Sequence, residues 1–127
     1  MITTTVGSLI AIKPVLQQLA NLEMPAKESF AILRMLKVID KEYESIESTQ
    51  RKMLELYGDR DENGNYKSDG HGGALIRKEN AEEFATQMGD FLKMEMELEC
   101  GKLKLDMLDK LQLTPNQLLK MEEFIEE

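Results

Sequence analysis

Residues 26–57 read AKESFAILRMLKVIDKEYESIESTQRKMLELY, a long run that contains neither glycine nor proline. Alanine, leucine, glutamate, lysine and methionine dominate it, and all of them are good helix formers. Pro25 precedes the run and Gly58 follows it, which are the residue types that commonly begin and end a helix. The sequence therefore predicts one long helix from Ala26 to Tyr57.

The apolar residues divide this predicted helix into two halves. In the first half they occur almost all round, so that half needs cover on more than one side. In the second half they narrow to a seam with alternate spacings of four and three, which is typical of a helix that pairs with one partner helix. The first half contains Phe30, Ile32, Leu33, Met35, Leu36, Val38 and Ile39, and the seam contains Ile39, Tyr43, Ile46, Gln50, Met53 and Tyr57.

A shorter helix is predicted before the long one, capped by Ser8. Its apolar residues share one face, but Pro14 interrupts it, removing an amide donor and clashing with the preceding turn. We therefore expect the helix to restart at Pro14, with Asn21–Met24 as the connection to Pro25. The shared face consists of Leu9, Ile12, Val15, Leu16 and Leu19.

After Gly58 the composition changes to Gly, Asp, Asn and Ser, and Tyr66 is the sole apolar residue of 58–73. Asn63-Gly64 favours the tight turn of a small β-hairpin. Gly70–Gly73 is expected to be too flexible to belong to that hairpin. We predict a flexible central loop near 58–78.

The rest of the chain predicts two more helices and an ambiguous segment between them. One helix begins at Asn80, with Glu83 completing a capping box, and its inner face contains Phe84, Met88, Phe91 and Leu92. The alternation of residues 94–105 suits a strand, although Met, Glu and Leu prefer helix. A last short helix begins at Thr114-Pro115, with an apolar side of Leu118, Leu119, Met121, Phe124 and Ile125.

These elements predict a mainly α fold in one domain, residues 1–127, with no visible internal repeat. Apolar residues make up 42% and charged residues 31%, as in a folded globular domain. The simplest arrangement pairs the long helix with the Asn80 helix as an antiparallel hairpin, and packs the short terminal helices around the apolar end.

The formal net charge of −8 argues against nucleic acid and acidic membranes as partners. A protein that mimics DNA could carry such a charge, but here Lys and Arg are interleaved with Asp and Glu, as on a solvated helix face. No segment approaches the roughly 20 apolar residues of a membrane span, and the N-terminus lacks a basic signal segment. We expect a protein that stays in the cytoplasm where it is made, or that travels as part of an assembly.

Several segments of the chain carry a resemblance to known proteins. They are Leu22-Glu23-Met24-Pro25-Ala26-Lys27, Tyr57-Gly58 with Asp61–Asn65, Glu82-Glu83-Phe84, and Leu113-Thr114-Pro115 with Phe124-Ile125-Glu126. Together these segments resemble a group of small, uncharacterised proteins of tailed phages and prophages of Gram-positive bacteria. The likeness spans most of the chain and implies a phage origin and a helical fold. The expected location is then the host cytoplasm, or a virion. It implies no catalytic residues, and the insertion at Asp69–Gly73 departs from its pattern.

Residues 59–71 offer the main alternative, a metal-dependent enzyme or regulator. Asp59, Asp61, Asn63 and Gly64 match the first six positions of a calcium-binding loop, but the twelfth position is Gly70 in place of a bidentate Glu. His71 beside Asp69 could act as a base, although a glycine-rich loop holds neither group in place. A hairpin turn is the preferred interpretation, with no metal and no cofactor.

Two other features could belong to a chemical site, but in each case a structural explanation is preferred. Glu95, Glu97 and Glu99 could form a carboxylate ladder on one side of a strand, but Lys102 and Lys104 follow them, which favours a solvated face. Cys100 has no histidine near it in sequence, which favours a structural thiol over a nucleophile.

The sequence therefore predicts a protein that binds other proteins without catalysis, in virion assembly or by occupying a host factor. The first half of the long helix has more apolar surface than one neighbour can cover. The partner is expected to be a second copy or another phage or host protein. The predicted partner-binding residues are Phe30, Leu33, Met35, Leu36 and Val38.

Overall fold

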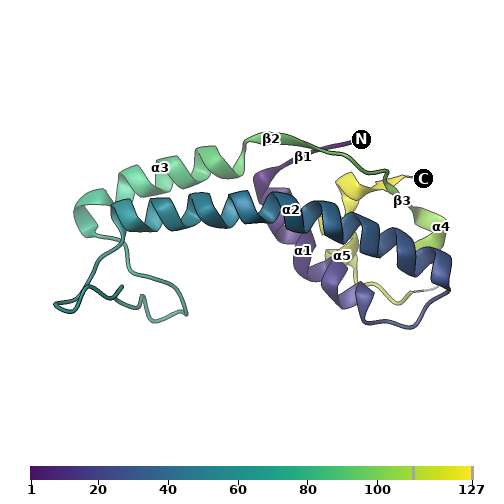
Figure 1. Cartoon of the computed structure of the whole chain (residues 1–127), viewed down its shortest axis with the longest axis horizontal. Coiled ribbons are helices and arrows are strands. Elements are labelled where there is room, and N and C mark those ends of the chain that lie inside the picture. Colours follow the sequence, from purple (N-terminus) through teal and green to yellow (C-terminus); the bar gives the residue numbers. More distant parts are fainter. Residues whose placement is uncertain (110, 127) are drawn as a thin grey trace. The chain divides into compact units, whose positions relative to one another are not determined.

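The computed structural model describes residues 1–109 and 111–126, and the predicted mainly α fold is confirmed (Figure 1). Its contacts divide the chain into two compact units. Unit 1 comprises Met1–Tyr43 and Leu92–Glu127, and unit 2 comprises Glu44–Phe91. Helix α2 supplies its first half to unit 1 and its second half to unit 2.

The predicted long helix is confirmed with the predicted bounds, as α2 (Ala26–Tyr57). It ends where the Gly58 amide donates to the Leu54 carbonyl at 2.7 Å. A Cβ atom at position 58 would lie 2.5 Å from that oxygen and 2.8 Å from the Tyr66 ring. Because real Cβ atoms do not approach so closely, the helix terminus requires glycine.

Helix α1 (Val6–Ala20) begins earlier than predicted, and Ser8 is not its cap. Thr5 is the N-cap, and its Oγ1 accepts a hydrogen bond from the Ser8 amide at 3.1 Å. The helix also runs through Pro14 instead of restarting there, so that prediction was wrong. Pro14 is exposed, whereas the predicted face on both sides of it is buried, so packing of one continuous stripe holds the two halves together.

Unit 1 also contains a two-stranded antiparallel sheet, formed by a strand before α1 and one after α3. Strand β2 (Glu95–Leu98) realises the predicted alternation, and it pairs with β1 (Ile2–Thr5), which the sequence analysis missed. The register sets Ile2 opposite Leu98, and both side chains are fully buried. The three consecutive threonines of β1 give no alternation of apolar and polar residues that would indicate a strand.

The C-terminal part of unit 1 consists of short elements. Strands β3 (Leu103–Lys104) and β4 (Ile125–Glu126) pair in parallel, and α4 (Leu105–Leu108) follows β3 directly. Helix α5 (Pro115–Lys120) has a complete capping box between Thr114 and Gln117, and a 3-10 turn, η2 (Glu122–Phe124), leads from it to β4.

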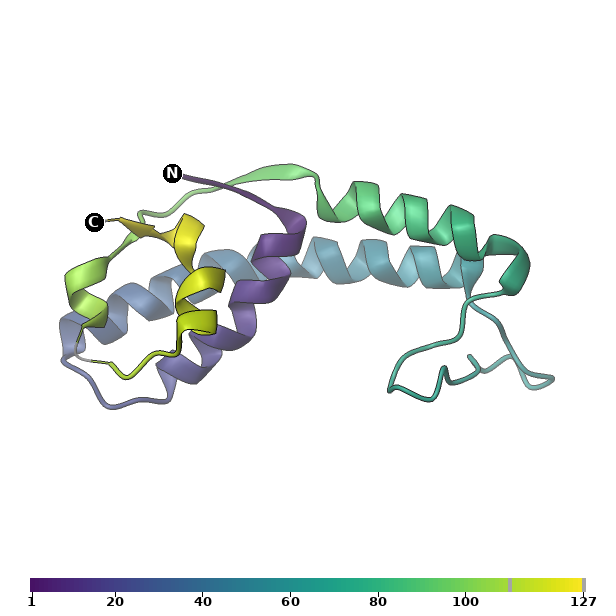
Figure 2. The same ribbon diagram turned by 180° about the vertical axis from the view of Figure 1, so that it is seen from behind.

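The core of unit 1 lies between α1, the first half of α2 and the C-terminal elements (Figure 2). Lys13 of α1 forms an ion pair with Asp40 of α2 at 3.2 Å and lies 3.8 Å above the Tyr43 ring. The buried Thr4 hydroxyl donates to the Glu123 carboxylate at 2.5 Å, which ties β1 to η2. The fully buried side chains are Ile2, Leu9, Ile12, Leu16, Leu19, Ile32, Met35, Ile39, Leu98, Met121 and Phe124.

Unit 2 contains the predicted helical hairpin, in which the second half of α2 and α3 (Ala81–Leu92) lie side by side and antiparallel (Figures 1 and 2). Ile46 and Met53 of the predicted seam are buried. At the loop end, the Tyr57 and Phe84 rings meet edge to face at a centroid distance of 6.0 Å.

The predicted capping box of Asn80 and Glu83 is wrong. The Asn80 amide donates to the Arg77 carbonyl at 2.9 Å, because a 3-10 turn, η1 (Lys78–Asn80), precedes α3. Glu83 Oε1 instead accepts from the Tyr57 hydroxyl at 3.1 Å. Desolvation, this hydrogen bond and the nearby negative charge raise the pKa of Tyr57.

Residues 58–77, here called the knob, have an order that the sequence analysis did not anticipate. Three segments eight residues apart are joined in a closed ring of backbone hydrogen bonds. The Asp59 amide donates to Leu75, the Leu75 amide to Lys67, and the Lys67 amide to Asp59, at 2.7–2.9 Å. Three antiparallel bridges link the same segments, at Gly58–Ile76, Arg60–Tyr66 and Ser68–Ala74. The last two bridges differ by eight residues at both positions.

The two turns of the knob, 61–65 and 69–73, are built alike. In each, the leading Asp accepts hydrogen bonds through Oδ1 from the amides two and four residues later, at 2.7–3.1 Å. The fourth residue is a glycine at positive φ, 80° at Gly64 and 86° at Gly72, a conformation that glycine adopts readily. The predicted turn at Asn63-Gly64 is present, and Gly70–Gly73 lie outside that hairpin, in the second turn. The two turns form an eight-residue repeat that the sequence did not reveal.

Candidate protein-binding surface

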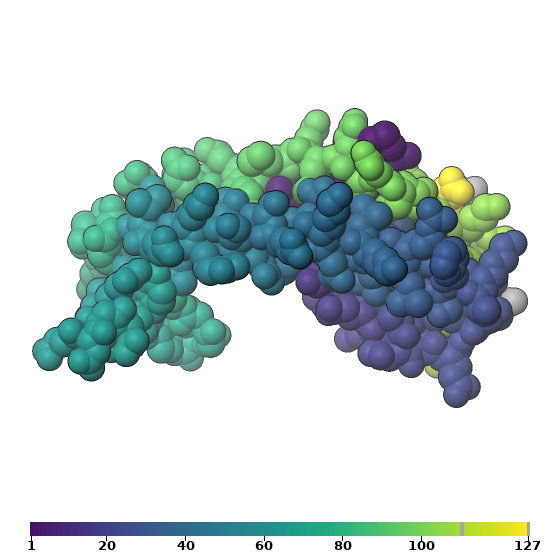
Figure 3. Space-filling view, viewed as in Figure 1, coloured from purple at the N-terminus to yellow at the C-terminus, as the bar shows by residue number. Residues whose placement is uncertain are grey.

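The structure separates the predicted partner-binding residues into an exposed and a buried group. Phe30 and Leu33 are 62% and 48% exposed, whereas Met35 and Leu36 are buried in the core of unit 1 and Val38 is half-buried. Positions 32, 35, 36 and 39 share the inner face of α2, and positions 30 and 33 lie outside it. One face of α2 is visibly uncovered in the space-filling view (Figure 3).

One of the two exposed side chains, Phe30, lies close to a charged group. The Arg34 guanidinium lies 5.7 Å from the centre of the Phe30 ring, close enough for a cation–π contact. Neither Phe30 nor Leu33 lines either of the two hollows of unit 1 described next.

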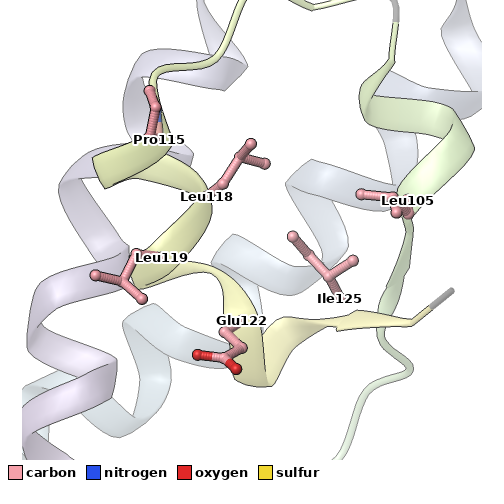
Figure 4. Close-up of a pocket in the computed structure, with 6 residues that line it drawn as sticks. All are labelled: Leu105, Pro115, Leu118, Leu119, Glu122 and Ile125. Carbon is pink, nitrogen blue, oxygen red and sulfur yellow. The ribbon is translucent and has the colours of Figure 1, made fainter.

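A second apolar surface in unit 1, here called the C-terminal hollow, is concave (Figure 4). It has a volume of about 480 Å³ and opens widely to solvent. Its walls come from α5, η2, β4 and the start of α4. The lining residues are Leu105, Pro115, Leu118, Leu119, Glu122 and Ile125.

The local folding of the C-terminal segment explains why these apolar side chains remain outside the core. Met121 and Phe124 are fully buried and fill the space beneath. Helix α5 ends at Lys120, so Leu118 and Leu119 do not share one helical stripe with them. Leu118 stays 37% exposed and Leu119 68% exposed.

A more polar hollow adjoins the first and shares Leu105 with it. It is lined by Lys104, Asp106, Asp109 and Glu126 besides Leu105. Among the residues that the structure describes, the two linings therefore contain four carboxylates, with Glu122 included, and one lysine. The apolar floor has an acidic rim.

Part of this surface is apparent in the sequence. The sequence predicts Leu118, Leu119 and Ile125 on the apolar side of the last helix, together with Met121 and Phe124. That prediction is wrong for its end, because the helix stops at Lys120 and Ile125 lies in β4. Leu105 and Pro115 were not assigned to any surface. The parallel pairing of β3 with β4, which places Leu103 opposite Ile125, brings Leu105 to the hollow, and two-residue strands leave no periodic signal.

The residues of the metal or enzyme alternative lie in the knob. The Asp61 and Asp69 side chains bind backbone amides of their own turns, and Asp59 lies 3.6 Å from the Lys67 ammonium. His71 is exposed, and its amide donates to Asp69. Within 1–109 and 111–126, no three His, Cys, Asp or Glu side chains are grouped as metal ligands.

The remaining candidates are separated from one another. Glu95 and Glu97 are exposed on β2, opposite Thr5 and Thr3, and Glu99 follows the strand. Cys100 is half-buried, and desolvation raises the pKa of its thiol against the smaller, lowering effects of the N-terminal ammonium and Arg34. The thiol is therefore mainly protonated at neutral pH, which makes it a weak nucleophile.

No helix in the described part of the chain combines the length and the hydropathy that crossing a membrane requires. Comparison of the chain with family models, curated proteins and solved structures finds nothing that matches it.

Proposed function

We propose that this chain is a phage-encoded protein that works by binding another protein, without catalysis, in virion assembly or by occupying a host factor. The phage origin rests on the sequence resemblance described above. The host cytoplasm, or a virion assembled there, is the proposed location. A small-molecule cofactor has no part in the proposal.

The C-terminal hollow is the observation that carries the binding role. Six residues from four short elements enclose a concave surface, and Leu119 at its edge is 68% exposed. A partner that covers these side chains would stabilise the complex by roughly 25 cal/mol for each Å² of apolar area removed from water. Concave apolar surfaces with a polar rim are typical of protein interaction sites.

Site-specific photo-crosslinking tests this role in cells that carry the phage or prophage. A photoreactive phenylalanine analogue replaces Leu119 in one variant and Leu56 in the other. Leu56 is the matched control, because it is 62% exposed on α2 within unit 2 and lines none of the hollows described above.

The expected result is one discrete crosslinked protein from position 119, absent from position 56, which the purified chain then binds in vitro. The same products from both positions, or none from position 119, would contradict the proposed function.

A further inference from the structure

We infer that the C-terminal hollow takes an apolar segment of another protein that is flanked by lysine or arginine residues. This inference rests on the proposed binding function and adds the chemistry of the partner. The charges around the hollow favour a basic partner, the symmetry of a dimer disfavours a second copy of the chain, and the wide opening to solvent disfavours a small molecule.

The charges around the hollow favour a basic partner. Asp106, Asp109, Glu122 and Glu126 line the apolar hollow or the one adjoining it, with Lys104 as the one cationic side chain in these linings among the described residues. All four acids are exposed, so their carboxylates remain hydrated and accessible. A third hollow, which shares Lys104 and Asp106 with the second, adds Lys27, Lys102 and Glu28, and the carboxylates still outnumber the lysines. A rim with an excess of negative charge steers a segment of the opposite sign and disfavours one of the same sign.

A second copy of the chain fits this surface poorly. In a twofold-symmetric dimer, both copies use the same surface, so two surfaces that each carry more carboxylates than lysines would be brought together. Like charges brought together at an interface oppose association. The excess acidity of the whole chain, a net charge of −8, adds to this repulsion.

A small molecule also fits poorly, because binding pockets normally enclose most of a small ligand's surface. The hollow is open to solvent along its length, with the exposed Leu119 at one side and Leu105, 38% exposed, at the other. A polypeptide can rest apolar side chains on this floor while its flanking residues reach the rim. Recognition therefore combines apolar contact at the floor with ion pairs at the edge.

Selection from a display library of random 14-residue peptides tests the inference directly. The full chain and a Leu119→Asn variant serve as parallel baits. The variant removes an exposed apolar side chain without changing the net charge, so general acidity is equal in both. Peptides enriched on the full chain should have apolar residues flanked by Lys or Arg, and the variant should enrich few of them.

Fluorescence anisotropy then measures one enriched peptide in three versions, with Lys, Gln or Glu at the flanking positions. Exposed ion pairs each change Kd by a factor of roughly 1.5 to 5. We expect the Lys version to bind about ten-fold more tightly than the Glu version at low salt, with a smaller difference at higher salt. Asp109→Asn with Glu122→Gln should weaken the Lys version several-fold and leave the Gln version unchanged.

Three outcomes overturn the inference. Enriched peptides without basic residues would show that the rim does not select the partner. Equal enrichment of basic peptides on Leu119→Asn would show attraction to general acidity. A dimer in light scattering that Leu119→Asn converts to monomer would make a second copy the occupant. The crosslinking experiment judges the binding function separately, because a discrete product at position 119 supports that function whatever the charge of the partner.

Discussion

At the scale of single residues, the seam of α2 depends on a few buried side chains. Ile46 is 3% exposed and lies on the inner face of the helical hairpin in unit 2. Ser48, two residues later, is exposed on the same helix. The two positions therefore differ in burial while sharing one backbone environment.

Ile46→Asp should destabilise the protein by roughly 3 kcal/mol or more, because it removes buried apolar volume and buries an unpaired charge. This is a large share of the 5–15 kcal/mol expected for a whole domain. Ser48→Asp should change stability by about 0.5 kcal/mol or less. Urea unfolding followed by circular dichroism measures both, and equal midpoints for the two variants would remove the seam from the fold.

Another residue-scale test separates the observed cap of α1 from the predicted one. Thr5→Ala should cost about 1 kcal/mol, because it removes the oxygen that accepts the Ser8 amide. Ser8→Ala should cost less than half as much, because it leaves that bond intact. Urea unfolding of the two variants gives the comparison, and a larger loss at Ser8 would restore Ser8 as the cap.

At the scale of elements, the knob shows how short polar segments acquire order without an apolar core. Its ring of backbone bonds satisfies amides that no helix or regular sheet would pair. The Asp side chains at the start of each turn satisfy two more amides apiece. The Arg60 guanidinium stacks 4.6 Å from the Tyr66 ring centre and donates to its hydroxyl at 2.8 Å.

Glycine substitutions should have opposite effects in the knob and in α3. Gly64→Ala or Gly72→Ala should destabilise the knob by roughly 1–2 kcal/mol, because an L residue resists positive φ even where space is open. Gly89→Ala, inside α3 and also in open space, should stabilise that helix by up to about 1 kcal/mol. Hydrogen exchange of the Lys67 amide reports knob opening, and thermal melts report α3. Unchanged exchange at Lys67 in both knob variants would contradict the turn geometry.

At the scale of the whole molecule, burial is unevenly divided among the helices. Six residues of α1 are buried, whereas α3 has none. Local stability generally follows buried apolar contact, so regions of low burial open more readily.

Amides of α3 should therefore exchange faster with deuterium than amides of α1, and within α2 the half that belongs to unit 2 should exchange faster than the half in unit 1. Hydrogen exchange measured residue by residue checks both comparisons. Uniform protection through α1, α2 and α3 would show that the chain unfolds in a single cooperative step.

The sequence by itself determined the elements whose signals are local and long. Helix α2 has its predicted bounds because a helix needs good formers and terminating residues, all of which are neighbours in the chain. The seam, the Asn63-Gly64 turn and the helix beginning at Pro115 rest on similarly short-range chemistry. The binding role and the phage origin predicted from the sequence stay predictions.

Only the tertiary structure decided the features that depend on distant residues. Strand β1 exists because Ile2 meets Leu98, and the continuity of α1 through Pro14 depends on a core that its flanking turns share. Phe30 and Leu33 are exposed, whereas Met35 and Leu36 are buried, because only one face of α2 packs against the rest of unit 1. The C-terminal hollow arises because Met121 and Phe124 occupy the core while Leu118 and Leu119 remain outside it. Periodicity shows which residues are apolar, but which of them water reaches is a property of the packed chain.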